Sequence, residues 1–196
     1  CDLVVDIGAN NGQWITAVRS RGFNGDAICI EPLKKNYIKL KADNSHNTIA
    51  LNCAVGNKNS YIYINQASND GLSSSIFELD DHHINAAPNI KYTGKEKVKI
   101  SKLSKILESD THKKIFVKID TQGYEMEVLK SINKSNFKHP EIIISPLTLD
   151  RYSSLANVLP DKDNISFLTM WESTLLPRFA VEELNLFAGK VFVPSM

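Results

Sequence analysis

The sequence predicts an α/β protein built on a parallel sheet. Short apolar, β-branched runs alternate with segments of helical periodicity, and the first run ends in a glycine-rich turn. This alternation is typical of βαβ units, whose helices cover both faces of a parallel sheet. The length of 196 residues suits one compact domain, and we find no internal repeat or linker that divides residues 1–196.

The predicted elements follow one another regularly at the start of the chain. The run Asp2–Ile7 predicts a buried strand, and apolar residues at helical spacing predict a helix over Gly12–Arg21, which Gly22 ends. The same alternation continues with a strand at Ala27–Ile30, a helix over 33–40, a strand at Thr48–Leu51 and an edge-like strand at Tyr61–Ile64.

The middle of the chain is less regular. Two polar stretches, Gln66–Ser75 and Asp80–Gly94, predict loops above the sheet, where substrate contacts commonly lie. The elements that we expect after them are strands at Val98–Ile100, Ile115–Ile119, Glu141–Ile144, Ile165–Met170 and Leu186–Val193, and helices at Leu103–Leu107, Tyr124–Ser131 and Arg151–Val158.

The composition excludes several classes of protein. With 42% hydrophobic residues and a formal net charge of +1, the chain lacks the signature of a disordered protein. Its 23 basic and 22 acidic residues leave no basic excess for nucleic acid or an anionic membrane. No apolar run approaches the roughly 20 residues that cross a bilayer. We expect no nucleic-acid or membrane partner, and the sequence does not indicate an oligomeric state.

The three cysteines, Cys1, Cys29 and Cys53, are too few and too scattered for a disulfide framework or a zinc site. Cys29 and Cys53 lie in apolar runs, which predicts buried core residues in a reducing compartment. Because the chain also carries no targeting signal, we expect a cytoplasmic protein. No spacing of acids and histidines indicates a metal site.

Polar residues follow three of the predicted strands. Asp6, Gly8 and Gly12 form a D-x-G-x-x-x-G turn, Glu31 ends the next strand, and Asp120 ends the run Ile115–Ile119. In an open α/β sheet these ends meet at the carboxyl edge, near the topological switch point where ligands bind. The glycines allow close backbone approach to a ligand.

The spacing of this turn separates two classes of cofactor. A dinucleotide fingerprint that starts at Gly8 needs glycines where Asn10 and Gln13 stand, and no P-loop follows. An adenosine cofactor without a diphosphate remains, which points to S-adenosylmethionine. Glu31 is placed to accept hydrogen bonds from its ribose. Asn10 or Asn11 is placed to cap the next helix, whose N–H groups attract anions. A glycine turn without a ligand is the alternative.

The segments VVDIGANNGQW, ICIEP, CAVG and VKIDTQGYEMEVLK resemble, in order and spacing, the FkbM-type methyltransferases, class I enzymes that use S-adenosylmethionine. The serine-containing GLSSSIFELD resembles a further segment of that family. The resemblance is strongest over residues 4–131, with 132–196 a divergent part of the same domain. It implies a Rossmann-like three-layer sandwich with a mostly parallel seven-stranded sheet and an antiparallel last strand. It also implies methylation of a hydroxyl group, often on sugars or polyketides.

The resemblance also assigns roles by position. The methionine end of the cofactor falls to Asp6, Gly8, Ala9, Asn10 and Gly12, the ribose to Glu31 with Pro32, the adenine to Ala54 and Val55, and the sulfonium and acceptor to Asp120 and Gln122. After Pro140 the chain departs from the family pattern, because Ser145 stands where an acid is common. A module that binds S-adenosylmethionine without turnover is therefore the alternative function.

Three residues are candidates for the general base that an alcohol acceptor needs. Asp120 is the first by position, with capping of the helix from Tyr124 or balancing of the sulfonium charge as its alternatives. His82 and His83 lie in a loop that can cover the site. The predicted substrate-binding residues are Ser73, Ser74, Ser75, Gln122 and Glu125, although an acid at a helix start such as Glu125 also has a structural explanation. Because these loops hold few aromatic rings, we expect a sugar or glycan hydroxyl as acceptor, with a polyketide or other small alcohol next.

Overall fold

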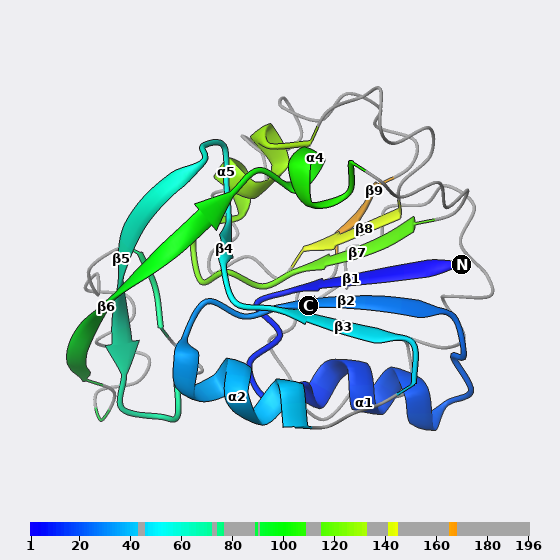
Figure 1. Cartoon of the computed structure of the whole chain (residues 1–196), viewed down its shortest axis with the longest axis horizontal. Helices are drawn as coiled ribbons and strands as arrows, with labels where there is room; N and C mark the ends of the chain where they lie inside the picture. The colour runs from blue at the N-terminus through cyan, green and yellow to red at the C-terminus, as the bar shows by residue number, and fades with distance from the viewer. Residues whose placement is uncertain are drawn as a thin grey trace, which may run out of the picture.

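A computed structural model describes residues 1–42, 46–71, 74–76, 89, 91–108 and 115–132, together with the backbone of 141–144 and 165–167. Its main element is a six-stranded sheet in the order β3-β2-β1-β7-β8-β9, in which every neighbouring pair is parallel (Figure 1). The strands are β1 (Leu3–Ile7), β2 (Asp26–Ile30), β3 (Thr48–Leu51), β7 (Ile115–Ile119), β8 (Glu141–Ile144) and β9 (Ile165–Phe167).

The strand order reverses beside β1. The chain runs outward from β1 to β3 and later returns as β7 on the other side of β1. The register pairs Ile7 with both Ile30 and Ile119, so β1, β2 and β7 end at the same level. This is the topological switch point at which open α/β sheets bind ligands.

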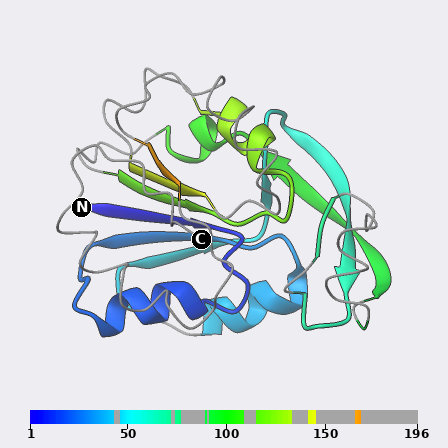
Figure 2. The ribbon, with the colours of Figure 1, turned by 180° about the vertical axis from the view of Figure 1, so that it is seen from behind.

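Helices cover both faces of this sheet. The helices α1 (Gln13–Ser20) and α2 (Lys34–Ala42) lie on one side, and α4 (Leu103–Ile106) and α5 (Glu125–Lys130) lie on the other, as the view from behind also shows (Figure 2). Alternate residues of β1 face opposite layers. Val5 packs in the cluster that holds Leu103 and Val128, whereas Val4 packs with Ile15 and Leu40. The prediction of a layered α/β fold with a mostly parallel sheet is confirmed.

A second, three-stranded sheet stands beyond the carboxyl ends of the main strands (Figure 1). Its order is β4 (Ala54–Val55), β6 (Tyr92–Ser101) and β5 (Ser60–Ala67), with β6 parallel to β4 and antiparallel to β5. No separate sheet is predicted from the sequence. The two loop predictions are wrong at Gln66 and Ala67, which belong to β5, and at Tyr92–Gly94, which belong to β6. Most of β6 before Val98 is exposed, so its sequence lacks the apolar alternation of a half-buried strand.

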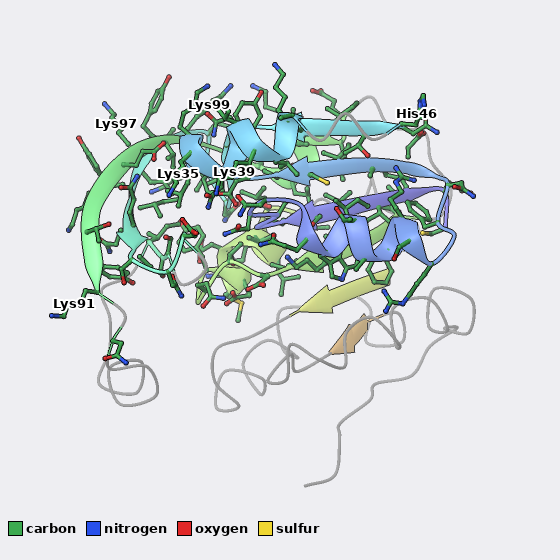
Figure 3. All side chains as sticks on the ribbon, turned by 90° about the horizontal axis from the view of Figure 1, so that it is seen from below. Lys35, Lys39, His46, Lys91, Lys97 and Lys99 are labelled. Carbon is green, nitrogen blue, oxygen red and sulfur yellow. The ribbon has the colours of Figure 1, made fainter. Side chains whose placement is uncertain are left out.

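The charged side chains of this region lie on the outside. Lys35 and Lys39 of α2 and Lys97 and Lys99 of β6, labelled in Figure 3, are all exposed. The opposite face of the second sheet is apolar and contributes buried residues to a small core cluster, namely Ala54, Ile62, Ile64, Val98 and Ile100. The second sheet therefore turns an apolar face toward the carboxyl edge of the main sheet.

Some predictions lie outside the described residues, among them the strand Leu186–Val193 and the helix Arg151–Val158. The seven-strand count and the antiparallel last strand therefore stay predictions. Cys29 and Cys53 are buried free thiols, as predicted. No helix within the described ranges has the length and apolar character needed to span a membrane.

The close approach of β1 and β7 yields a test of the fold. A Cβ added to Gly8, whose φ is +80°, would lie 1.9 Å from the carbonyl oxygen of Asp120. Gly22 has a similar φ of +98° but no heavy atom within 4 Å of such a Cβ. We expect Gly22→Ala to lower the free energy of unfolding by about 1–2 kcal/mol through backbone strain alone, and Gly8→Ala to lower it by more than about 3 kcal/mol. Urea unfolding measures both, and equal losses would contradict this packing.

Candidate functional site

A pocket opens at the carboxyl edge of the sheet, between the ends of β1, β2 and β7 and the second sheet. Its lining comes from five segments far apart in the sequence: the turn after β1, the residues after β2, the strand β4, the part of the chain from β5 to Ile76, and the loop after β7. Ten of the lining residues are among those that the sequence predicts for the site, namely Gly8, Asn10, Glu31, Pro32, Ala54, Val55, Ser74, Ser75, Asp120 and Gln122. Apolar side chains such as Val55 and Ile76 face a small number of carboxylate, amide and hydroxyl groups.

The turn after β1 is held by its own backbone. Gly8, Asn10 and Gly12 have positive φ angles of 80°, 50° and 84°. The N–H groups of Gly8 and Ala9 donate to the carbonyl oxygen of Ile30, and that of Gly12 donates to Ala9. Gly12 is the N-cap of α1 and the helix has no side-chain cap, so the predicted capping by Asn10 or Asn11 is wrong. The side-chain oxygen of Asn10 accepts instead from the N–H of Asn11, at 2.8 Å.

Glu31 is a buried carboxylate at the end of β2 and is only 5% exposed. Its Oε2 accepts from the N–H of Asn10 at 2.9 Å, and its Oε1 accepts from the N–H of Leu33 at 2.8 Å. Burial raises the pKa of Glu31 to about 7 in spite of these two hydrogen bonds. Each oxygen has room for a second hydrogen bond, so the group is a fixed acceptor on the pocket wall.

A buried lysine joins the two strands beside the pocket. Lys118 Nζ forms an ion pair of 2.9 Å with Asp6 and lies 3.7 Å from Asp120 Oδ2. It also donates to the carbonyl oxygen of Gly8 at 3.0 Å. Burial lowers the pKa of Lys118, but the surrounding carboxylates outweigh burial and raise it, so the lysine stays protonated. Burial raises the pKa of Asp6 against the attraction of this lysine.

The loop after β7 presents Asp120 to the pocket. Gln122, at a φ of 54°, donates from Nε2 to Asp120 Oδ1 at 2.8 Å, and its carbonyl oxygen accepts from Ser75 Oγ at 2.7 Å. Behind the loop, Glu125 Oε1 accepts from the N–H groups of Thr121 and Gly123 at 3.1 and 3.0 Å. Burial raises the pKa of Glu125. These contacts fix the loop and with it the direction of the Asp120 carboxylate.

The structure brings ten of the predicted site residues into the lining of one pocket, the ten named at its description. Four other predicted residues lie behind that lining and support the turn after β1 or the loop after β7, namely Asp6, Ala9, Gly12 and Glu125. Ser73, His82 and His83 lie outside the described residues. Within the described part of the chain, no group of three or more His, Cys, Asp or Glu side chains is arranged to hold a metal ion.

Several residues at the site are not predicted from the sequence, and Lys118 and Tyr124 are the most informative of them. Lys118 lies within the run Ile115–Ile119, which predicts an apolar strand, although a charge inside a fully buried strand needs a partner and so indicates an ion pair. Tyr124 lines the pocket from the end of the loop after β7, and it packs against the apolar face of the second sheet. Since that sheet was not predicted, the sequence offered no signal for Tyr124.

A doubly wound sheet with an acid-bearing pocket at its switch point defines the class of open α/β proteins, which bind their ligands at the carboxyl edge of the sheet. Within that class, residues 6–168 match the sequence model of the FkbM methyltransferase domain, so the chain belongs to the FkbM methyltransferase family. No match was found among curated proteins or among solved structures. The predicted family is thereby confirmed, and the domain is that of a methyltransferase.

Glu31 gives the protein a pH-dependent stability. Because its pKa is about 7 in the folded protein and 4.5 when unperturbed, the folded state binds more protons between these values than the unfolded state. The contribution of Glu31 to the free energy of unfolding therefore falls as the pH rises through this window, by on the order of 3 kcal/mol in total. Urea unfolding from about pH 5 to about pH 8 measures it.

Two variants isolate this effect. Glu31→Gln has no proton to lose, so its stability should change less with pH than that of the wild type, even though the amide forfeits one of the two backbone hydrogen bonds. Glu127→Gln, at a partly exposed site on α5, should keep the wild-type dependence. The same pH dependence in Glu31→Gln and in the wild type would contradict the assignment.

Proposed function

We propose that this protein is an S-adenosylmethionine-dependent O-methyltransferase that acts on a hydroxyl group of a sugar, a glycan or a small secondary metabolite. One observation carries the proposal: the carboxylates of Glu31 and Asp120 line a single pocket at the switch point of the sheet in a chain of the FkbM methyltransferase family. A second acid, Asp6, and the cation of Lys118 support that pocket from below.

The residues of the pocket suit this cofactor. Glu31 has acceptor capacity for ribose hydroxyls, the small apolar residues Ala54 and Val55 suit an adenine ring, and Asp120 supplies negative charge for a sulfonium. Every N–H of the turn from Gly8 to Gly12 already donates within the protein. The turn therefore packs against the cofactor without offering free N–H groups to it. A phosphate-binding loop differs, because its free N–H groups bind the anion.

When bound, S-adenosylmethionine supplies a methyl group on a cationic sulfur. The chain's own residues then orient the acceptor and remove its proton. Asp120 is the group for proton removal, because it is 25% exposed to the pocket and Gln122 holds it at 2.8 Å. A positioned base contributes about 10²–10⁴-fold, and alignment of the reacting atoms contributes roughly 7–11 kcal/mol.

The polar rim of the pocket favours a hydroxyl-rich acceptor. Ser74, Ser75, Thr121 and Gln122 all line it with hydroxyl or amide groups. Among the described lining residues, Tyr124 is the only aromatic one. Flat apolar acceptors are held mainly by stacking on rings, whereas sugars are held by hydrogen bonds from groups of this kind.

Isothermal titration with S-adenosylmethionine tests the proposal, with NAD as the comparison ligand. We expect binding of the former alone, and a loss of about 1–3 kcal/mol in Glu31→Ala because the ribose loses its acceptor. Glu127→Ala should bind like the wild type. Release of S-adenosylhomocysteine with sugar acceptors distinguishes an enzyme from a silent binding module. Unchanged affinity in Glu31→Ala would contradict the ribose assignment.

Asp120→Asn tests the chemical step. Asparagine keeps an oxygen that accepts from Gln122 but takes no proton, so turnover should fall by about 10²–10⁴-fold while the melting temperature changes little. Turnover and thermal unfolding are measured on the same preparation. If turnover survives and the melting temperature collapses, Asp120 is structural, and His82 and His83 become the candidates for the base.

A further inference from the structure

We propose that the outer face of the second sheet is a docking surface for an acidic glycan acceptor, a saccharide chain whose sugar rings carry carboxylate groups. The inference deepens the proposed function and rests on it, because it concerns the acceptor of that reaction. The outer face is defined by Tyr61 and Tyr63 of β5 and by Lys95, Lys97 and Lys99 of β6. None of these five side chains lines the pocket, so the surface is separate from the site of the cofactor.

The strand register places these side chains together on one face of the sheet. Tyr61 of β5 lies opposite Lys99 of the antiparallel strand β6, and directly opposed residues share a face. Tyr63 lies opposite Lys97 in the same pair, and Lys95 continues the row two residues earlier. All three lysines are exposed, and the two tyrosines are 63% and 60% exposed. Lys97 and Lys99 point outward from the second sheet (Figure 3).

The strands of the second sheet give this face one sign of charge. They contain a single acid, Glu96, which lies opposite the buried Ile64 and therefore belongs to the inner face. There Glu96 accepts from the N–H of Lys34 at 3.0 Å and from Nε2 of Gln66 at 2.7 Å. The outer face holds three lysines and no acid from these strands. Since the formal net charge of the whole chain is +1, its near balance hides a local positive excess.

Folding alone is a poor explanation for this set of side chains. Lys97 Nζ lies 5.3 Å from the ring centre of Tyr61, a cation–π contact that contributes little at an exposed site. Alternate residues of a strand are about 7 Å apart, so neighbouring lysines in the row repel one another. A solvated surface usually mixes both signs of charge. A bound anion removes the repulsion in the row.

The pairing of each ring with a lysine indicates the chemistry of the ligand. Opposed residues of an antiparallel pair have Cβ atoms about 4.5–5.5 Å apart, so a cation stands beside each tyrosine ring. A uronic acid matches this arrangement, because its carboxylate is attached directly to the sugar ring. The C–H groups of the sugar pack on tyrosine while the carboxylate pairs with the ammonium. In a nucleotide the ribose separates the phosphate from the base, so a ring and a cation this close suit it less.

The edge of the second sheet connects this face to the pocket. Tyr63 is two residues from Asn65, whose N–H donates to the carbonyl oxygen of Ser75 at 2.9 Å, and the N–H of Ser75 donates back at 3.3 Å. Ser75 lines the pocket, and its Oγ donates to the carbonyl oxygen of Gln122. A chain bound across the two tyrosines can therefore pass the edge at Ser75 and present a following sugar to the pocket.

The probe for this surface is a fluorescently labelled oligogalacturonate, whose binding to the whole protein is measured by fluorescence anisotropy at low and at high salt. A neutral dextran oligomer of the same length and an oligothymidylate of the same charge are the comparison ligands. We expect oligogalacturonate to bind most tightly and dextran not to bind. The affinity should fall as salt rises, because salt screens exposed charges.

The lysines are tested by a charge-matched pair of variants. Lys97→Gln combined with Lys99→Gln should weaken binding of oligogalacturonate at low salt by about 5- to 30-fold, because two exposed ion pairs are lost. Lys105→Gln combined with Lys130→Gln removes the same charge from exposed positions on α4 and α5 and should bind like the wild type. Equal weakening in the two double variants would indicate unspecific attraction and overturn the inference.

The tyrosines are tested by Tyr61→Thr combined with Tyr63→Thr, which keeps residues that suit an exposed strand. Binding should weaken by about 3- to 10-fold at both salt concentrations, because ring contacts are not screened. Wild-type affinity in this variant would show that the rings do not contact the sugar and would overturn the glycan assignment. Circular dichroism and cooperative urea unfolding confirm that each variant folds.

The remaining outcomes separate the inference from the function on which it rests. S-adenosylmethionine, titrated into the same preparations, should bind equally to every variant, because the outer face does not line the pocket. A wild type that binds S-adenosylmethionine but not oligogalacturonate would overturn the inference and leave the proposed cofactor standing. Oligothymidylate bound as tightly as oligogalacturonate would overturn the choice of a glycan. Binding of oligogalacturonate without S-adenosylmethionine would overturn the proposed function and, with it, the role of the glycan as acceptor.

Discussion

The ion pair between Asp6 and Lys118 is the constraint on which the site depends. It lies at the point where the strand order reverses, and it connects β1 to β7 from inside the sheet. Both residues are nearly inaccessible to solvent, so neither is stable there as an ion without the other. Lys118 also binds the carbonyl oxygen of Gly8, 110 residues away in the sequence. The pair therefore fixes the glycine turn against the loop that carries Asp120.

The close packing of that turn follows from the same arrangement. The backbone of Gly8 lies against the carbonyl group of Asp120, with no space for a side chain, while the N–H of Asp120 donates to Ile7. On its other side the turn supplies the N–H of Asn10 to Glu31. The two pocket acids are thus held by contacts with a single turn. Any displacement of the turn moves both, which is why a small loop sets the geometry of the whole pocket.

The sequence predicts the parts of this structure that depend on local pattern. Apolar runs predict β1, β2, β3 and β7, and the rule that parallel strands end at one edge places Glu31 and Asp120 in one site. The second sheet escapes prediction because β6 is mostly exposed and polar, and its pairing with β5 and β4 is decided by tertiary contacts. Lys118 is not predicted as a site residue because its partners Asp6 and Gly8 are distant in the sequence. For Glu125 the sequence left a structural and a substrate role open, and the structure gives its carboxylate three donors in the loop before it.

Burial and mutual electrostatic interaction together determine the ionisation of the charged groups around the pocket, which are Asp6, Glu31 and Lys118. Asp120 lies beside them and is half-buried. Three carboxylates and one ammonium leave an excess of negative charge at an apolar pocket, and burial opposes this excess by raising the pKa of Asp6 and Glu31. A positive charge bound in the pocket favours the ionised forms of Asp6 and Glu31, whereas a neutral ligand does not. Lys118 acts against burial, because its positive charge lowers the pKa of Asp6 and, less strongly, that of Glu31. The pair of Lys118 with Asp6 therefore joins the two strand ends beside the pocket and also moderates the cost of burying carboxylates there.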